Sequence, residues 1–228
     1  MINGVEFLEK KYLTIQRLVD IALIIQQVVR GVDDYRKCKS LVDDILIILK
    51  LLSGLAPPVG YSFLYPNDCP NNLTCFKDLK TGIAYAKKVN KPIMLDFTGY
   101  ACVNCRKMEE HVWSSKKIDN LLRNEYVLIS LYVDDKKELP LEEQVLVNRI
   151  NGGTRKLTNY GHKWANFQTQ FFESNSQPFY VLLDSEGKII LSDAVGYEPD
   201  EDIYAQFLEC GLTISEDLSK NNKLDFNK

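Results

Sequence analysis

The sequence predicts an α/β protein with a central mixed sheet flanked by helices and an N-terminal helical hairpin ahead of it. Two observations predict this class. From residue 76 onward, apolar stretches of strand length alternate with segments of helical periodicity. Residues 5–52 instead carry apolar side chains at spacings near three and four on either side of a break at Gly31 and Asp33-Asp34, which is typical of paired helices.

These patterns divide the chain into four segments. Residues 1–52 form the predicted hairpin, an accessory, tether or docking segment, and residues 53–75 form a linker rich in Pro, Gly and Asn. Residues 76–212 form the main domain, interrupted by a polar insertion at 134–160. A polar tail, 213–228, ends the chain.

The elements of the main domain follow from periodicity and composition. Each predicted strand is short, apolar and rich in β-branched or aromatic residues, and each predicted helix has a recurring apolar face. The predicted helices span 79–90, 102–113, 118–123, 164–172 and 202–212, and the predicted strands span 92–97, 126–133, 179–184 and 188–191. The last two strands are expected to form a hairpin, because a Ser-Glu-Gly turn joins them.

A Cys-x-x-Cys pair, Cys102 and Cys105, lies between the strand at 92–97 and a run of good helix formers. This order places the first thiol at the start of a helix. Free backbone N–H groups and the helix dipole favour an anion there, so we expect Cys102 to have a lowered pKa and to be a nucleophile. Cys105 follows one turn later and can close a disulfide with it. The pattern predicts a redox-active dithiol.

Two other interpretations of the pair are a structural zinc site and inert thiols. Structural zinc usually needs two such pairs, and only Cys69, Cys75 or His111 could complete the site, at unusual spacings. We therefore expect no metal and no other cofactor, because a dithiol itself carries two electrons.

Cys69 and Cys75 bracket a short stretch of the linker and could form a structural disulfide in an oxidising compartment. Two reduced thiols are the alternative, and the sequence does not decide between them. Cys38 and Cys210 are interpreted as ordinary buried thiols.

Charge and hydropathy exclude some classes of protein. The net charge of −3 argues against nucleic acid as the main partner, because there is no basic excess to neutralise phosphates. The longest uncharged stretch of helical character, 21–29, is far shorter than the roughly 20 residues that a membrane span needs. The first residues lack the basic start and apolar core of a signal peptide.

Three separated segments resemble one known family. DFTGYACVNCRKMEEHVW (96–113), LYVDDKKELP (131–140) and SQPFYVLLD (176–184) occur in the order seen in the C-terminal thioredoxin-like domain of DsbD-type thiol:disulfide interchange (cytochrome c biogenesis) proteins. The resemblance covers about residues 76–212. It implies a thioredoxin-like fold and an enzyme, a protein-disulfide reductase of the periplasm or cell envelope.

The sequence also departs from this family in one respect. Full-length DsbD-type proteins carry a polytopic membrane domain ahead of this one, whereas residues 1–52 here form a predicted helical hairpin. The chain is then either a fragment or a relative that docks on a separate membrane electron donor.

Roles at the site follow from the resemblance. Cys102 would attack a disulfide of the partner protein, here called the client, and Cys105 would resolve the mixed disulfide. Asp96 would lie beneath the cysteines and relay a proton to or from the resolving thiol, and Glu109 matches a second acid of the family. Together these acids would hold the pKa of Cys102 near neutral, which favours a reductant. An exposed position is the alternative for each acid.

The resemblance further implies a cis peptide bond between Gln177 and Pro178, facing the cysteines and offering backbone groups to a client chain. Tyr100 either contacts a client or closes the turn before the pair. Trp113 and Trp164 are interpreted as core residues.

Two alternatives to a reductase stay open. One is a disulfide oxidase or isomerase that uses the same dithiol. The other is a non-catalytic thioredoxin-like adaptor that acts through its N-terminal helices. The expected partners are protein thiols and disulfides, with contact to a membrane surface through residues 1–52 as a separate hypothesis.

Overall fold

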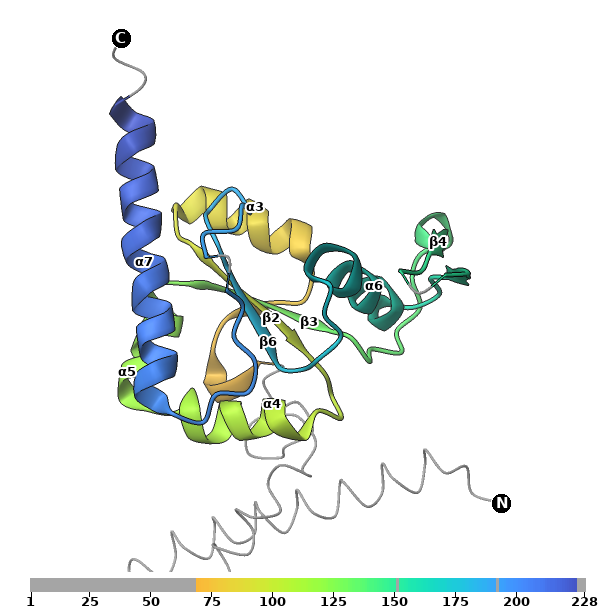
Figure 1. The fold of residues 1–228 in the computed structure, drawn as a ribbon, viewed down its shortest axis with the longest axis horizontal. Helices are drawn as coiled ribbons and strands as arrows, with labels where there is room; N and C mark the ends of the chain where they lie inside the picture. Colours follow the sequence, from red (N-terminus) through yellow and green to blue (C-terminus); the bar gives the residue numbers. More distant parts are fainter. Residues whose placement is uncertain (1–68, 151, 192, 225–228) are drawn as a thin grey trace, which may run out of the picture. The chain divides into compact units, whose positions relative to one another are not determined.

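The computed structural model describes residues 69–150, 152–191 and 193–224 (Figure 1). The chain divides into two compact units, Met1–Asn72 and Leu73–Lys228. Of the first unit, only the residues from Cys69 onward are described, and they include a short 3₁₀ turn, Pro70–Asn72. The predicted hairpin at 1–52 and Cys38 lie outside the described residues.

A four-stranded mixed sheet forms the centre of the second unit (Figure 1). The strand order is β1 (Cys75–Phe76), β3 (Val127–Tyr132), β2 (Ile93–Thr98) and β6 (Phe179–Leu183). Strand β3 runs parallel to both β1 and β2, whereas β6 runs antiparallel to β2. The prediction of a mixed sheet is therefore confirmed.

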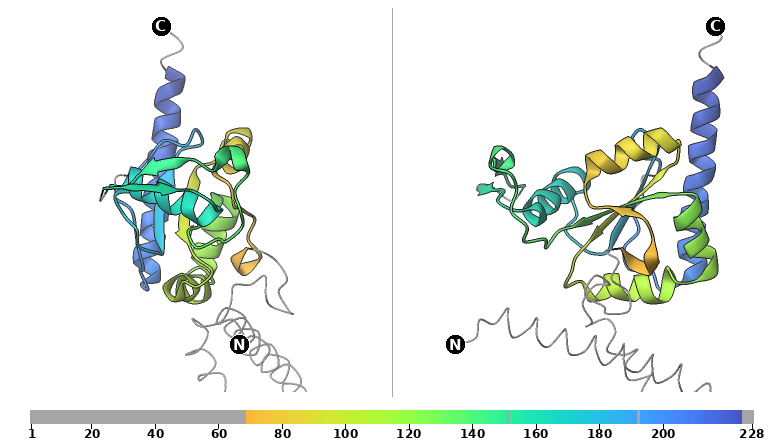
Figure 2. Two further views of the ribbon diagram at one scale, coloured as in Figure 1. Left: turned by 90° about the vertical axis from the view of Figure 1, so that its right-hand side faces the viewer. Right: turned by 180° about the vertical axis from the view of Figure 1, so that it is seen from behind.

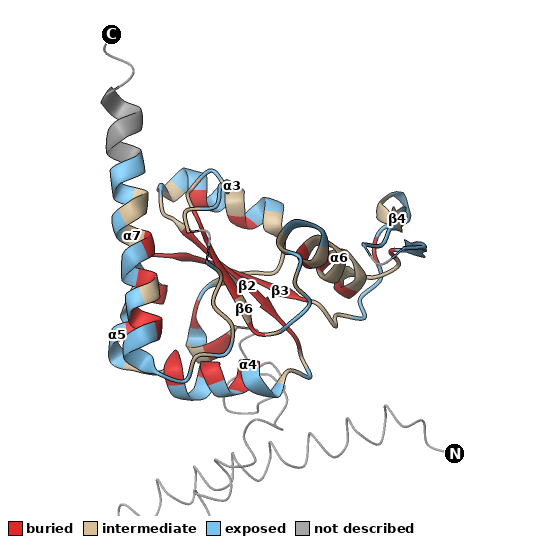
Figure 3. Ribbon diagram, viewed as in Figure 1, coloured by how far each residue is buried: buried red, intermediate tan, exposed pale blue. Residues whose placement is uncertain are grey.

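Helices cover both faces of this sheet. On one face lie α4 (Val103–Lys107) with its continuation η3 (Met108–Val112), α5 (Lys116–Asn124) and α7 (Glu201–Leu224); on the other lie α3 (Leu79–Val89) and α6 (Tyr160–Phe172). Figures 1 and 2 show α7 and α5 along one side and α3 with α6 on the opposite side. Figure 3 shows that the strands and the inward helix faces are the buried parts.

Strand β2 contributes side chains to both cores, because successive side chains of a strand point to opposite faces. Ile93, Leu95 and Phe97 pack with α3 and α6. Met94 packs in the other cluster, with the cysteine helix, α5 and α7. Asp96, two residues after Met94, therefore faces the cysteine helix.

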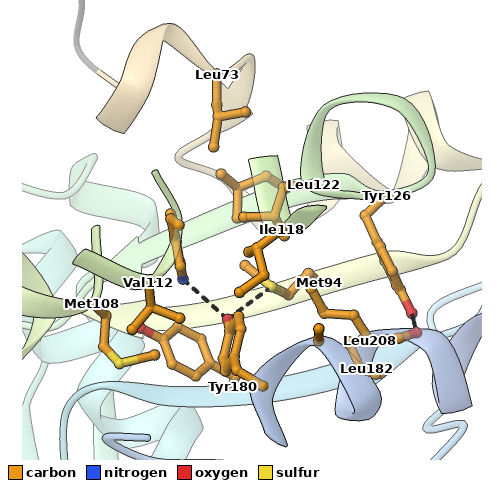
Figure 4. Packing of buried hydrophobic residues seen from close by; sticks show 14 residues of the cluster. Leu73, Met94, Met108, Val112, Ile118, Leu122, Tyr126, Tyr180, Leu182 and Leu208 are labelled. Atoms are coloured by element: carbon orange, nitrogen blue, oxygen red, sulfur yellow. Dashed lines mark hydrogen bonds between the residues drawn. The ribbon is translucent and has the colours of Figure 1, made fainter. Parts of the chain in front are cut away.

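Hydrogen bonds within the cluster that packs Met94 with the cysteine helix, α5 and α7 hold α7 in place (Figure 4). The buried indole of Trp113 donates to the hydroxyl of Tyr204 at 3.1 Å, and that hydroxyl contacts the sulfur of Met94 at 3.4 Å. The hydroxyl of Tyr126 donates to the carbonyl of Leu208 at 2.6 Å. Trp113 and Trp164 are both core residues, as predicted.

Two elements differ from the predictions. Helix α7 continues past residue 212 to Leu224, because helix formers without Pro follow the buried part. The predicted strand at 188–191 is reduced to an isolated bridge between Leu183 and Ile189. The chain then leaves β6 and returns to it at Val195, which exchanges both backbone hydrogen bonds with Tyr180.

The insertion at 134–160 has structure of its own. It contains a 3₁₀ turn, Leu141–Glu143, and a two-stranded antiparallel hairpin of β4 (Leu146–Asn148) and β5 (Thr154–Lys156). Both strands are mostly exposed, whereas Leu139 and Leu157 of the insertion are buried.

Candidate active site

The cysteine pair begins helix α4. Cys102 is the N-cap residue, and its sulfur accepts a hydrogen bond from the backbone N–H of Cys105 at 3.1 Å. The two side chains are joined in a disulfide, with 5.3 Å between their Cα atoms. Cys102 is half-buried, whereas Cys105 is only 1% exposed. An attacking thiolate therefore has access to Cys102 but not to Cys105.

The loop before Cys102 is held by Asp134, a residue 34 positions away in the sequence from Tyr100. The Asp134 carboxylate accepts the backbone N–H groups of Tyr100 at 2.8 Å and Ala101 at 2.9 Å. A side chain at Gly99 would meet this carboxylate, because an added Cβ would lie 3.0 Å from Asp134 Oδ2. Asp134 thus determines where the chain enters the cysteine helix.

Tyr100 closes this turn. Its ring stacks on Tyr132 of β3 with 4.2 Å between the centroids, and the ammonium group of Lys77 lies 5.2 Å from the Tyr132 ring centre. Of the two roles considered for Tyr100, the stacking favours the structural one. Its half-exposed position leaves contact with a client chain as a prediction.

Replacing Asp134 by alanine should loosen this loop. Two charge-assisted hydrogen bonds are lost, so we expect the free energy of unfolding to fall by about 1 to 3 kcal/mol. Urea denaturation of the oxidised protein measures this change. Asp193→Ala, at an exposed acid in the segment between β6 and α7, is the matched control and should have little effect. Equal losses in both variants would show that Asp134 does not hold the loop.

Asp96 is a buried acid in the middle of β2. It is 2% exposed and pairs with Ser130 of β3 and Tyr180 of β6 in the sheet register. Burial raises the pKa of Asp96 to about 7, against the opposing effects of the Ser130 hydroxyl and of the Arg106 guanidinium. The alternative of an exposed acid at this position is wrong.

Glu109 is the second buried acid, and it belongs to the cysteine helix. It is 5% exposed, and its Oε2 lies 2.6 Å from Nη1 of Arg106. Burial raises the pKa of Glu109 to about 8, while Arg106 lowers it and the negative charges of Asp96 and Glu110 raise it further. The alternative of an exposed position is wrong here too.

Arg106 is a functional candidate that the sequence interpretation missed. In the sequence it is one of the good helix formers that follow Cys102, yet it is 4% exposed and its Nη2 donates to Thr98 Oγ1 at 3.3 Å. Its three-residue spacing from Glu109 places both side chains on one helix face, and this was the available signal. The helix then continues as a π turn, in which the N–H of Trp113 donates to the carbonyl of Met108 at 2.8 Å.

The loop before β6 meets the cysteine end of β2. The peptide bond between Gln177 and Pro178 is cis. Because Phe179 pairs with Phe97 near the end of β2, Pro178 adjoins the point where the cysteine loop begins. The buried side chain of Gln168 holds this loop: its Nε2 donates to the carbonyl of Ser176, and its Oε1 accepts from the side chain of Gln177, both at 2.8 Å. Sequence reasoning gave no signal for Gln168.

Cys69, Cys75, Cys210 and His111 have no assigned role in the chemistry of this site. Cys69 and Cys75 are both disulfide-bonded, and their pairing with each other stays a prediction. Cys210 is an exposed free thiol, so the expectation that it is buried is wrong. Its position on α7 faces solvent, whereas Leu208, two residues earlier, faces the core. His111 is exposed, and no cluster of three metal-ligating side chains occurs among the described residues.

The family model of the thioredoxin-like domain matches residues 79–210, which is more than half of the chain. The chain belongs to the thioredoxin-like family. The thioredoxin-like fold is thereby confirmed. Thioredoxin-fold oxidoreductases carry out redox chemistry on their own cysteines without a cofactor, and they act on protein thiols and disulfides. The more specific resemblance to DsbD-type domains stays a prediction.

The solved structures to which this chain is similar are distant in sequence. A DsbH oxidoreductase is 20% identical, with 63% of this chain and 87% of that chain covered and a TM-score of 0.44. A thioredoxin from Thermus thermophilus is 15% identical, with coverages of 63% and 89% and a TM-score of 0.45. A disulphide isomerase from Xylella fastidiosa Temecula1 is 14% identical, with coverages of 62% and 88% and a TM-score of 0.34.

No curated protein matches the sequence. Among the helices of the described residues, none is long and apolar enough to cross a membrane.

Proposed function

We propose that this thioredoxin-like protein is a thiol:disulfide oxidoreductase that reduces disulfides of partner proteins in the cell envelope, in the manner of the C-terminal domain of DsbD-type proteins. Its electron donor would be a separate membrane protein. One observation carries the proposal: an accessible Cys102 is disulfide-bonded to a buried Cys105 on the sheet face that also buries Asp96 and Glu109.

The proposed reaction transfers two electrons from the reduced dithiol to a client disulfide. The Cys102 thiolate attacks one client sulfur, so that a mixed disulfide forms and the first client thiolate leaves. Cys105 loses its proton to a buried carboxylate and attacks Cys102 Sγ. The second client thiolate leaves, and both client thiolates take up protons from water. The protein is left with the Cys102–Cys105 disulfide.

The buried acids support the reductive direction. A strongly oxidising dithiol owes its high potential to a very stable thiolate in the reduced form. Negative charge at Asp96 or Glu109 would oppose the Cys102 thiolate and keep its pKa from falling far. The reduced form then has less stabilisation, and the disulfide is the favoured product.

The reduction potential of the Cys102–Cys105 couple tests this direction. We expect a value below about −200 mV, whereas an oxidase would lie near about −120 mV. The protein is equilibrated with mixtures of reduced and oxidised dithiothreitol or glutathione, free thiols are alkylated, and the peptide containing both cysteines is quantified by mass spectrometry. This peptide-level readout separates the couple from Cys69 and Cys75. A value near that of an oxidase would contradict a reductase and favour the oxidase alternative.

A further inference from the structure

The most unusual electrostatic feature of the described residues is a buried guanidinium that is ion-paired with one buried carboxyl group and near a second. Arg106 forms an ion pair with Glu109. On the facing strand, the Arg106 charge lowers the pKa of Asp96, and the negative charge of Asp96 raises the pKa of Glu109. Nε of Arg106 has no hydrogen-bond partner among the described residues. An arginine cannot shed its charge, so it balances one carboxylate in this interior but not two.

Other charged or titratable groups face this cluster from each neighbouring element. The phenols of Tyr132, Tyr180 and Tyr204 come from β3, β6 and α7, and burial raises the pKa of each, so they stay neutral in the physiological range. Tyr100 raises the pKa of Tyr132 further, and Glu110, an exposed acid on the cysteine helix, raises the pKa of Glu109. The charge of the buried cluster is therefore decided by Asp96, Arg106 and Glu109.

We propose that Arg106 is a positioning residue that keeps one proton, and only one, on the Asp96–Glu109 pair near neutral pH. With one carboxylate ionised, the cluster is neutral and a proton acceptor is available. Loss of the second proton would leave an unbalanced negative charge in the interior. Burial makes such a charge unfavourable, so the second proton is retained. This inference deepens the proposed function, because the available carboxylate is the group that accepts the proton of Cys105.

The proposal predicts opposite effects for two neighbouring substitutions. In Arg106→Met the balancing charge is absent, so both acids keep their protons near neutral pH and no acceptor remains. In Glu109→Gln the guanidinium is left with Asp96 alone, so Asp96 ionises at lower pH. A merely structural role for Arg106 would not explain why the pKa of the remaining acids rises in Arg106→Met but falls in Glu109→Gln.

Stopped-flow kinetics with reduced protein and dithiobisnitrobenzoate separates the two cysteine steps. All variants carry Cys210→Ser as well, because the exposed thiol of Cys210 would also release coloured thiolate. The first release then reports attack by Cys102, and the second reports resolution by Cys105. We expect the pH midpoint of the second phase to rise by about one unit or more in Arg106→Met and to fall by about half a unit or more in Glu109→Gln. The midpoint of the first phase should move less than that of the second.

Lys107→Met is the matched control, because it removes a positive charge from the next position of the same helix, where the side chain is exposed. Its second-phase midpoint should stay close to that of the wild type. Arg106→Lys retains the charge and should restore most of the wild-type midpoint. Equal shifts in Lys107→Met and Arg106→Met would overturn the proposal, because a general charge effect would then suffice.

A readout independent of activity counts the protons directly. Infrared spectra of the oxidised protein near neutral pH report the C=O stretch of protonated buried carboxyl groups. We expect one such group in the wild type, two in Arg106→Met and none in Glu109→Gln. The same count in the wild type and in Glu109→Gln would overturn the proposal. If Arg106→Met does not fold, the proposal is still tested by the carboxyl counts of the wild type, Glu109→Gln and Arg106→Lys.

The two proposals fail in different ways. A protein that does not reduce clients but shows the expected carboxyl counts would refute the proposed function and leave the role of Arg106 intact. A protein that reduces clients, with both pH midpoints unmoved by Arg106→Met, would refute the role of Arg106 alone.

Discussion

Replacing Cys102 by serine is expected to abolish client reduction. Cys102 is the accessible member of the pair, and a serine hydroxyl cannot take the place of the thiolate in disulfide exchange. Insulin reduction, followed by the turbidity of the released chains, should fall by about 10³-fold or more, to the background rate. The substitution leaves the volume of the site almost unchanged, so folding should be preserved.

The partner substitution gives the complementary result. Cys105→Ser keeps the nucleophile but removes the resolving thiol, so the mixed disulfide with a client should accumulate and survive non-reducing electrophoresis. Cys210→Ser is the matched control, because it removes an exposed free thiol on α7, away from the pair. If insulin reduction survives in Cys102→Ser but is lost in Cys210→Ser, then Cys210 carries the activity. That result would contradict the assignment of Cys102 as the nucleophile.

Asp96→Asn should make the protein more stable and less active. An acid with a higher pKa in the folded than in the unfolded state binds more protons when folded, between those two pKa values. For Asp96 these are about 7 and the ordinary value of 3.8. Its stabilising contribution is complete below the lower value and is lost as the pH rises through the higher one. Wild-type stability should therefore decline from mildly acidic to mildly alkaline pH.

The neutral amide removes this pH dependence. A shift of about three pKa units corresponds to at most about 4 kcal/mol, so we expect Asp96→Asn to gain about 1 to 3 kcal/mol over the wild type at about pH 8. Little gain is expected at about pH 3, below both pKa values, where the wild-type acid is mostly protonated in both states. Urea denaturation of the oxidised protein at several pH values measures both quantities.

Activity should change in the opposite sense. Without the Asp96 carboxylate, the resolution step loses a proton acceptor, and insulin reduction near neutral pH should fall by about 10- to 100-fold. Asp193→Asn, which removes an exposed acid, is the matched control for both measurements and should change neither. A variant that is less stable than the wild type at alkaline pH would show that Asp96 is not a destabilising buried charge.

The agreement between sequence and structure is best where a feature depends on neighbouring residues. The strand at 92–97, the Cys-x-x-Cys pair and the following helix are local patterns, and the structure places Cys102 at the N-cap as expected. The place of Asp96 within this strand was also evident from the sequence, whereas its burial beneath the cysteines was implied only by the resemblance to DsbD-type domains. The buried tryptophans followed from their size and apolar character.

The predictions fail where a residue depends on partners that are distant in sequence or on the side of a helix that faces solvent. Cys210 was expected in the core, yet the rotation of α7 turns it outward. The strand expected at 188–191 forms only a bridge, since the chain turns away and pairs with β6 again at Val195. Short apolar runs do not reveal how much of their length finds a pairing partner.

By itself, the sequence determined the dithiol and its setting: a thiol at the start of a helix, its mate one turn later, and an acid in the strand before them. Tertiary structure alone decided what surrounds them. Asp134 reaches the cysteine loop from the end of another strand, Gln168 holds the loop before Pro178, and Arg106 turns inward to pair with Glu109. The physical reason is that helical and strand periodicities specify which side chains share a face, whereas packing specifies what that face meets.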